Sequence, residues 1–170
     1  NLIKELKELE EKCDKLTFEI TQTLIYCTTE SLAGERALRV TSLLRVAGEL
    51  EDIGDCCHRL VQLAHRKYRK NRVLPQETLR EIKVFSEQIL DFMELYQTHL
   101  KDGSIPDIKK AELIENRIDA SRKSLRKNAV KRMQDNENLK AEMIYIDILN
   151  EMESIGNDAL NVVQALNHVV

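Results

Sequence analysis

The chain has 170 residues, of which 32% are charged and 42% are hydrophobic, with only 5 glycines and 2 prolines. This length suits one domain that buries its own core, and the composition is typical of a helical bundle and argues against a β-sandwich or barrel. The formal net charge of -3 gives no general reason to bind nucleic acid. The four cysteines show no paired spacing, which indicates free thiols in a reducing compartment, the cytosol.

Two helices are predicted in the first part of the chain. The segment TTESLAG separates a helix over about residues 1–28 from a long one over about residues 34–71, and Pro75 then starts a new element. The first helix shows apolar side chains at three- and four-residue steps, which predicts one buried stripe. That stripe comprises Leu2, Leu6, Leu9, Cys13, Leu16, Ile20, Leu24 and Cys27.

Three further helices are predicted over about residues 76–101, 107–134 and 138–168. The segment KDGSIPD separates the first two of them, and QDNEN separates the last two. Connections this short predict antiparallel neighbours. The expected fold is therefore all-α, an antiparallel helical bundle.

Acidic pairs spaced four residues apart lie on one face of a helix, where they repel unless a cation lies between them. Such pairs are common by chance, so only their placement carries an argument. An antiparallel hairpin centred between Leu32 and Ala33 places one pair on the first helix level with a pair on the second. These pairs are Glu10 with Asp14, and Glu51 with Asp55.

A second acidic set lies in the last two helices. A hairpin centred on Asn136 places Glu115 and Asp119 level with Asn157 and Glu153. Glu115 follows Glu10 by 105 positions and Glu153 follows Glu51 by 102 positions, so the chain looks internally duplicated.

In the second helix of each pair, a glycine stands three residues after the first acid. Gly54 follows Glu51 in this way, and Gly156 follows Glu153. A helical glycine costs about 1 kcal/mol relative to alanine, but it lets a neighbouring helix or a bound ion approach closely. Four carboxyl groups converging between two helices suit iron, manganese, zinc, magnesium or calcium. In the competing interpretation, the acids form a solvated face of a metal-free helical scaffold.

The strings LRVTSLLRVAGELEDIGD and EMESIGN closely resemble the repeated signature of PhoU-like proteins, regulators of phosphate uptake, and the resemblance covers essentially the whole chain. It implies two three-helix repeats, residues 1–72 and 73–170, with an iron or zinc cluster bound by Glu/Asp-x-x-x-Asp motifs. Only five helices are predicted, so the first repeat lacks its first helix. The metal ligands implied by the motifs are Glu10, Asp14, Glu51, Asp55, Glu115, Asp119 and Glu153.

The fourth motif departs from the family pattern, because Asn157 stands where an aspartate is expected. The substitution removes one charge, and Asp158 is directed about 100° away from that position. We therefore expect the second site to be weaker or empty.

PhoU-like domains occur as cytosolic tails of bacterial sodium/phosphate cotransporters and as free-standing partners of a phosphate ABC transporter and its sensor kinase. The abrupt beginning of the sequence favours the tail, located at the inner face of the membrane and partnered by its own transmembrane domain or another membrane phosphate transporter. A homo-oligomer would also fit, because the missing helix leaves apolar surface to cover. No nucleic-acid partner is expected.

Three remaining motifs have competing interpretations. Cys56, Cys57 and His58 cannot all bind one zinc ion, because adjacent helical side chains diverge by about 100°, so buried thiols are expected. A di-metal carboxylate enzyme would use Glu-x-x-His on two helices, and the chain offers only Asp55-x-x-His58. The basic segments 65–72 and 122–132 are expected to be solvated helix ends, with a membrane or partner patch as the alternative. The sequence thus predicts a regulatory binding domain and no enzyme.

Overall fold

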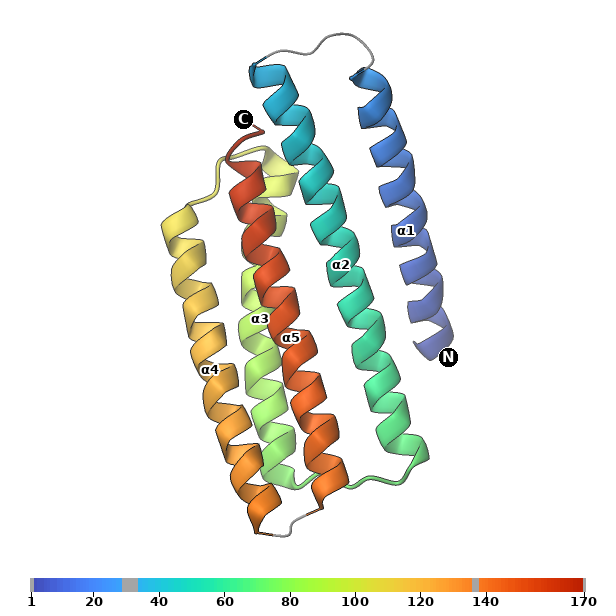
Figure 1. The fold of residues 1–170 in the computed structure, drawn as a ribbon, viewed down its shortest axis with the longest axis vertical. Helices are drawn as coiled ribbons and strands as arrows, with labels where there is room; N and C mark the ends of the chain where they lie inside the picture. Colours follow the sequence, from blue (N-terminus) through green and yellow to red (C-terminus); the bar gives the residue numbers. More distant parts are fainter. Residues whose placement is uncertain (1, 29–33, 136–137, 170) are drawn as a thin grey trace.

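In the computed structural model, which describes residues 2–28, 34–135 and 138–169, the chain forms five α-helices (Figure 1). They are α1 (Leu2–Cys27), α2 (Glu35–Arg69), α3 (Gln76–Asp102), α4 (Ile108–Gln134) and α5 (Leu139–Leu166). Their bounds lie within two residues of the predicted ones, and the all-α class is confirmed. The predicted hairpin centres, between Leu32 and Ala33 and on Asn136, lie outside the described residues. None of the five helices is long and apolar enough to cross a membrane.

Local chemistry explains several helix ends. Pro75 precedes α3, where its fixed φ and missing N–H are tolerated. Gly103 ends α3 with a φ of 69°, a left-handed conformation that favours glycine. The Asp107 side chain caps α4 by accepting a hydrogen bond of 3.2 Å from the backbone N–H of Lys110. The connections identified from glycine and proline are therefore real helix boundaries.

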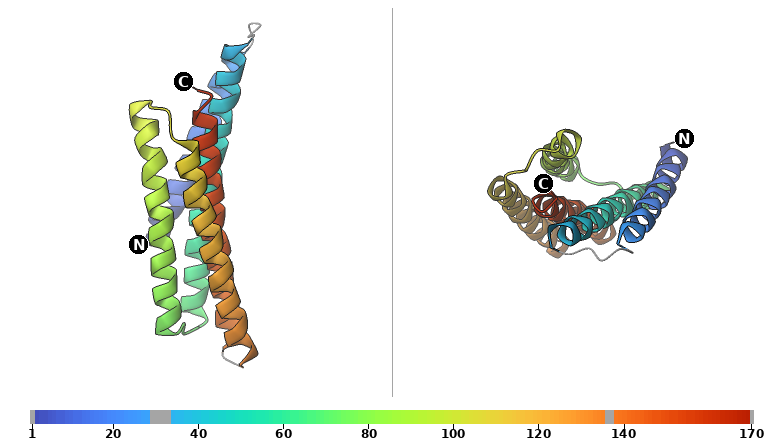
Figure 2. Two further views of the ribbon diagram at one scale, coloured as in Figure 1. Left: turned by 90° about the vertical axis from the view of Figure 1, so that its left-hand side faces the viewer. Right: turned by 90° about the horizontal axis from the view of Figure 1, so that it is seen from above.

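α5 lies at the centre of the bundle. Among the described residues, it packs against α2, α3 and α4, whereas α1 packs against α2 alone and stands at the edge (Figures 1 and 2). Tyr145, Leu149, Val162 and Val163 of α5 are completely buried. The core therefore lies among α2, α3, α4 and α5.

The predicted stripe of α1 is too wide. Leu6, Cys13 and Leu24 are half-buried against α2, but Leu9 and Leu16 are 60% and 47% exposed. Ile20 and Cys27 are exposed as well, and no side chain described in α1 is fully buried. The reason is that a helix with one neighbour buries only the narrow stripe that faces it. α1 is consequently the most weakly packed helix.

A buried polar network joins α3, α4 and α5 near the end of α4 and the start of α5. The Arg132 guanidinium on α4 donates two hydrogen bonds, of 3.0 and 3.1 Å, to the Glu142 carboxylate on α5, which is 1% exposed. It also donates one of 3.2 Å to Glu81 on α3, which accepts another of 2.7 Å from the Tyr145 hydroxyl. These pairings satisfy a buried charge and fix α3, α4 and α5 to one another.

Candidate functional site

The first acidic site consists of Glu10 and Asp14 on α1 and Glu51 and Asp55 on α2. The structure brings one carboxylate oxygen each from Glu10, Asp14 and Asp55 within 4.8 Å of one another. Asp14 is exposed and the other two are half-buried, so an ion in solution can reach the cluster. Oxygen donors at this spacing, contributed by two helices, fit a metal cation.

Glu51 lies beside this trio and responds to its charge. Its pKa is raised, first by burial and then by the negative charges of Asp55, Asp52, Asp14 and Glu10. Apart from burial, these neighbouring carboxylates on α1 and α2 therefore repel a negative charge on Glu51. A cation placed there would relieve this repulsion.

Gly54 of α2 faces Cys13 of α1 at the level of the first acidic site. A Cβ atom added at Gly54 would lie 3.4 Å from Cys13 Sγ on α1, which is an ordinary van der Waals contact. Cys13 itself has a raised pKa, caused first by burial and then by the charges of Asp14 and Glu51. The structure therefore places α1 beside Gly54 but leaves room for an alanine side chain at this position.

Two α2 residues at the edge of the site, His58 and Arg59, were not among the predicted ligands. His58 Nδ1 lies 3.6 Å from Glu10 Oε2 and is a buried atom without a hydrogen-bond partner. Arg59 Nη1 lies 3.3 Å from Asp55 Oδ2, and its Nε is 2.8 Å from Glu151 Oε2 on α5. The spacing from Asp55 to His58 was the available signal, because residues three apart share a helix face.

The burial expected for the neighbouring thiols is complete for Cys56 and partial for Cys57. Cys56 is 2% exposed, and burial raises its pKa to about 11, so it is a protonated core thiol at neutral pH. Cys57 is half-buried, and burial raises its pKa as well. All four cysteines of the chain are free.

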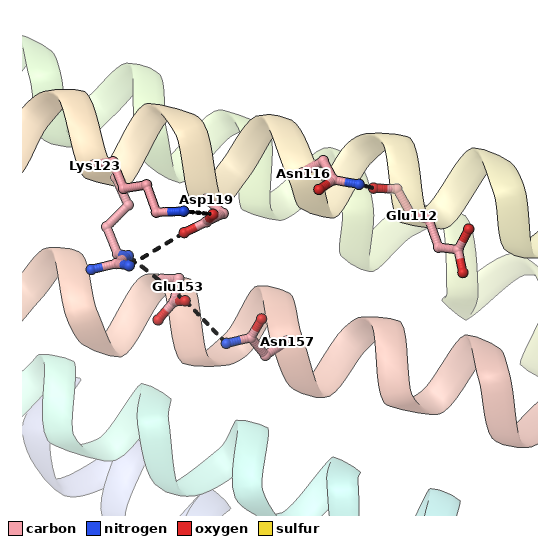
Figure 3. Close-up of polar contacts among 7 residues, drawn as sticks. Glu112, Asn116, Asp119, Lys123, Glu153 and Asn157 are labelled. Carbon is pink, nitrogen blue, oxygen red and sulfur yellow. Dashed lines mark hydrogen bonds and ion pairs between the residues drawn. The ribbon is translucent and has the colours of Figure 1, made fainter.

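The second acidic site consists of Glu115 and Asp119 on α4 and Glu153 and Asn157 on α5. Its acids are contacted by cations of the chain itself: Arg122 Nη2 lies 3.3 Å from Asp119 Oδ1, and Arg122 Nε lies 3.7 Å from Glu153 Oε1. Lys123 Nζ donates to Asp119 Oδ2, and the Asn157 amide donates to Glu153 Oε1 at 3.1 Å (Figure 3). These residues do not fit a bound metal ion as they stand.

The pKa shifts at the second site agree with this pairing. The pKa of Asp119 is lowered, mainly by the hydrogen bond from Lys123 and also by Arg122. The pKa of Glu115 is raised, first by burial and then by Asp119 and Glu153. Asp119 therefore carries a negative charge that Lys123 and Arg122 stabilise, whereas the pKa of Glu51 at the first site is raised.

The two glycines face corresponding residues of the neighbouring helices, although the contact at Gly156 is tighter. A Cβ atom added at Gly156 would lie 3.2 Å from Cγ2 of Ile118 on α4, just as one at Gly54 meets Cys13 on α1. Ile118 follows Cys13 by 105 positions, the same interval that relates the acids of α1 and α4. These matched contacts support an internal duplication.

Asp158, next to Asn157 in the chain, responds more strongly to the acids of α2 than to Glu153 of the second site. Burial and the charges of Glu49 and Asp52 on α2 raise its pKa to about 6. Its principal charged neighbours thus lie on α2, while Glu115 and Asp119 lie on α4.

Comparison with known families finds a match to the PhoU domain over residues 1–64. This segment contains all four acids of the first site together with His58 and Arg59. A search of the curated proteins found no match to the chain. The second acidic site lies outside the matched residues.

Proposed function

We propose that this chain, which is PhoU-like through its domain at residues 1–64, is a metal-binding regulatory domain that controls phosphate transport. The PhoU domain itself suggests involvement in phosphate-transport regulation. The observation that supports metal binding is the convergence of three carboxylates from two helices within 4.8 Å. Within the described residues, we find no arrangement that suggests catalysis, and we propose binding without turnover.

Glu10 and Asp14 on α1 and Glu51 and Asp55 on α2 would hold the metal, which the family resemblance suggests is iron or zinc. The bound cation would supply positive charge between carboxylates that otherwise repel. α1 has no other helix to hold it, because it packs only against α2. Occupancy of the site would therefore determine how firmly α1 is attached, and with it the surface offered to a partner.

We further propose that the domain works at the inner face of the membrane, as the cytosolic tail of a sodium/phosphate cotransporter. The support is the general likeness of the chain to such domains, and no single motif carries it. Its partner would be the transmembrane part of the same transporter. The alternative is a free-standing regulator that acts on a phosphate ABC transporter and its sensor kinase.

The test is phosphate uptake by cells that express the complete protein containing this chain, at low and high external phosphate. Glu51→Gln combined with Asp55→Asn should change the response of uptake to external phosphate, whereas the matched variant Glu153→Gln at the second site should not. Repeating the assay in cells without the ABC transporter separates the two contexts, because only a cotransporter tail would keep its effect. Unchanged uptake in the folded, expressed double variant would refute the regulatory function.

A further inference from the structure

The two acidic sites differ in the residues that follow the acids of α1 and α4. At the interval of 105 positions, Arg122 and Lys123 of α4 correspond to Thr17 and Phe18 of α1. Thr17 is half-buried and Phe18 is 64% exposed. α4 thus brings two positive charges to its site, while α1 brings none at the equivalent positions.

Arg122 lies between the helices, where a bridging ion would have to lie. Its guanidinium contacts Asp119 on α4 and Glu153 on α5, and its side chain is only 17% exposed. Its Nε is buried without a hydrogen bond, so its contact with Glu153 is one of charge. Figure 3 shows Lys123 directed at Asp119, with Glu153 and Asn157 on the facing helix. An entering cation would have to displace both positive groups and overcome their repulsion.

The first site has a weaker internal counterion. Arg59 has a side chain that is 46% exposed, and it contacts Asp55 alone among the four acids of the first site. Its closest carboxylate is that of Glu151 on α5, outside the site. Arg59 therefore flanks the first site, whereas Arg122 bridges the second.

We propose that the second acidic site is closed to metal by Arg122 and Lys123, which take the place of the ion and make it a permanent ion-pair network. This differs from the family resemblance, which implies a metal at both sites. The contacts of Arg122 and Lys123 support the closure of the second site by themselves. The further statement that metal binds only between α1 and α2 rests on the proposed function. The α4–α5 contact would then be independent of metal.

The closure of the second site is tested by titrating the metal-free full chain with zinc. Calorimetry and native mass spectrometry measure the binding. In the wild-type protein, Glu51→Gln should weaken zinc binding by about tenfold or more, whereas Glu153→Gln should leave it unchanged. The variant Arg122→Thr/Lys123→Ala/Asn157→Asp should bind additional zinc, and adding Glu153→Gln should remove that gain. Loss of zinc by Glu153→Gln in the wild-type background, or no gain in the folded triple variant, would overturn the proposal.

A reciprocal substitution keeps the test independent of the fold of the triple variant. Thr17→Arg places a guanidinium three residues after Asp14, as Arg122 follows Asp119, and should weaken zinc binding at the first site by about tenfold or more. Thr17→Gln, which adds length without charge, is the matched control and should retain zinc. Equal zinc affinity in Thr17→Arg and Thr17→Gln would contradict closure by charge. If the wild-type protein binds no zinc, the proposed function fails, and the gain in the triple variant still decides the closure.

Discussion

Glu51 and Asp119 carry the same functional group, yet their pKa values shift in opposite directions. Burial and neighbouring carboxylates raise the pKa of Glu51, while Lys123 and Arg122 lower that of Asp119. Deprotonated Asp119 therefore stabilises the fold at neutral pH, and this contribution is lost as the pH falls through its lowered pKa. Deprotonated Glu51 destabilises the fold at neutral pH, because its pKa is raised in the folded protein. A bound cation would relieve this destabilisation.

Asp158→Asn should make stability less dependent on pH. The pKa of Asp158 is about 6 in the folded protein against an ordinary 3.8, so between about pH 8 and about pH 5 the folded state takes up a proton that the unfolded state does not. The wild-type protein therefore gains stability from this group as the pH falls, and the asparagine variant does not. Urea unfolding at both pH values measures the difference. An advantage of the variant that does not shrink towards the lower pH would contradict the assignment.

Gly156→Ala should be less favourable than Gly54→Ala. Each alanine gains about 1 kcal/mol of helix propensity, but the new Cβ at position 156 would lie 3.2 Å from the buried side chain of Ile118. Overpacking of this kind costs about 1–3 kcal/mol, whereas the contact of 3.4 Å with Cys13 at position 54 is ordinary. Chemical denaturation of both variants measures the free energy of unfolding. A Gly156→Ala protein as stable as Gly54→Ala would show that Ile118 moves aside freely.

The individual helices differ in how far the sequence determines their packing. The bounds of α3 and α4 follow from Pro75, Gly103 and Asp107, because proline, glycine and a capping aspartate act locally. The buried face of α1 did not follow, since its apolar residues outnumber the contacts that α2 alone provides. Periodicity gives the apolar face of a helix but not the number of its neighbours.

α1 should respond to metal while α4 does not. Hydrogen exchange of the backbone amides, measured with zinc and after chelation, should show α1 losing protection on metal removal, because its acids would lose the cation that links them to α2. α4 serves as the internal control, since its acids are paired with Arg122 and Lys123. The Glu51→Gln variant should show a much smaller effect. Equal responses of α1 and α4 would contradict a single metal site.

On the scale of the whole molecule, the two helical hairpins reuse one arrangement with different electrostatics. Facing acids and an intervening glycine occur in both, which supports the division into repeats 1–72 and 73–170. That division stays a prediction. The sequence placed the acids on facing helices, because hairpin register depends on the turn position and helical spacing. It did not reveal the closure by Arg122, which depends on side-chain direction, and that residue was assigned to a solvated basic segment.

The most direct test of one metal centre is anomalous diffraction from crystals of the full chain grown with zinc, recorded above and below the zinc absorption edge. The account predicts an anomalous peak among Glu10, Asp14 and Asp55, and no peak between Asp119 and Glu153. A peak at the second site, or an empty first site at saturating zinc, would contradict it.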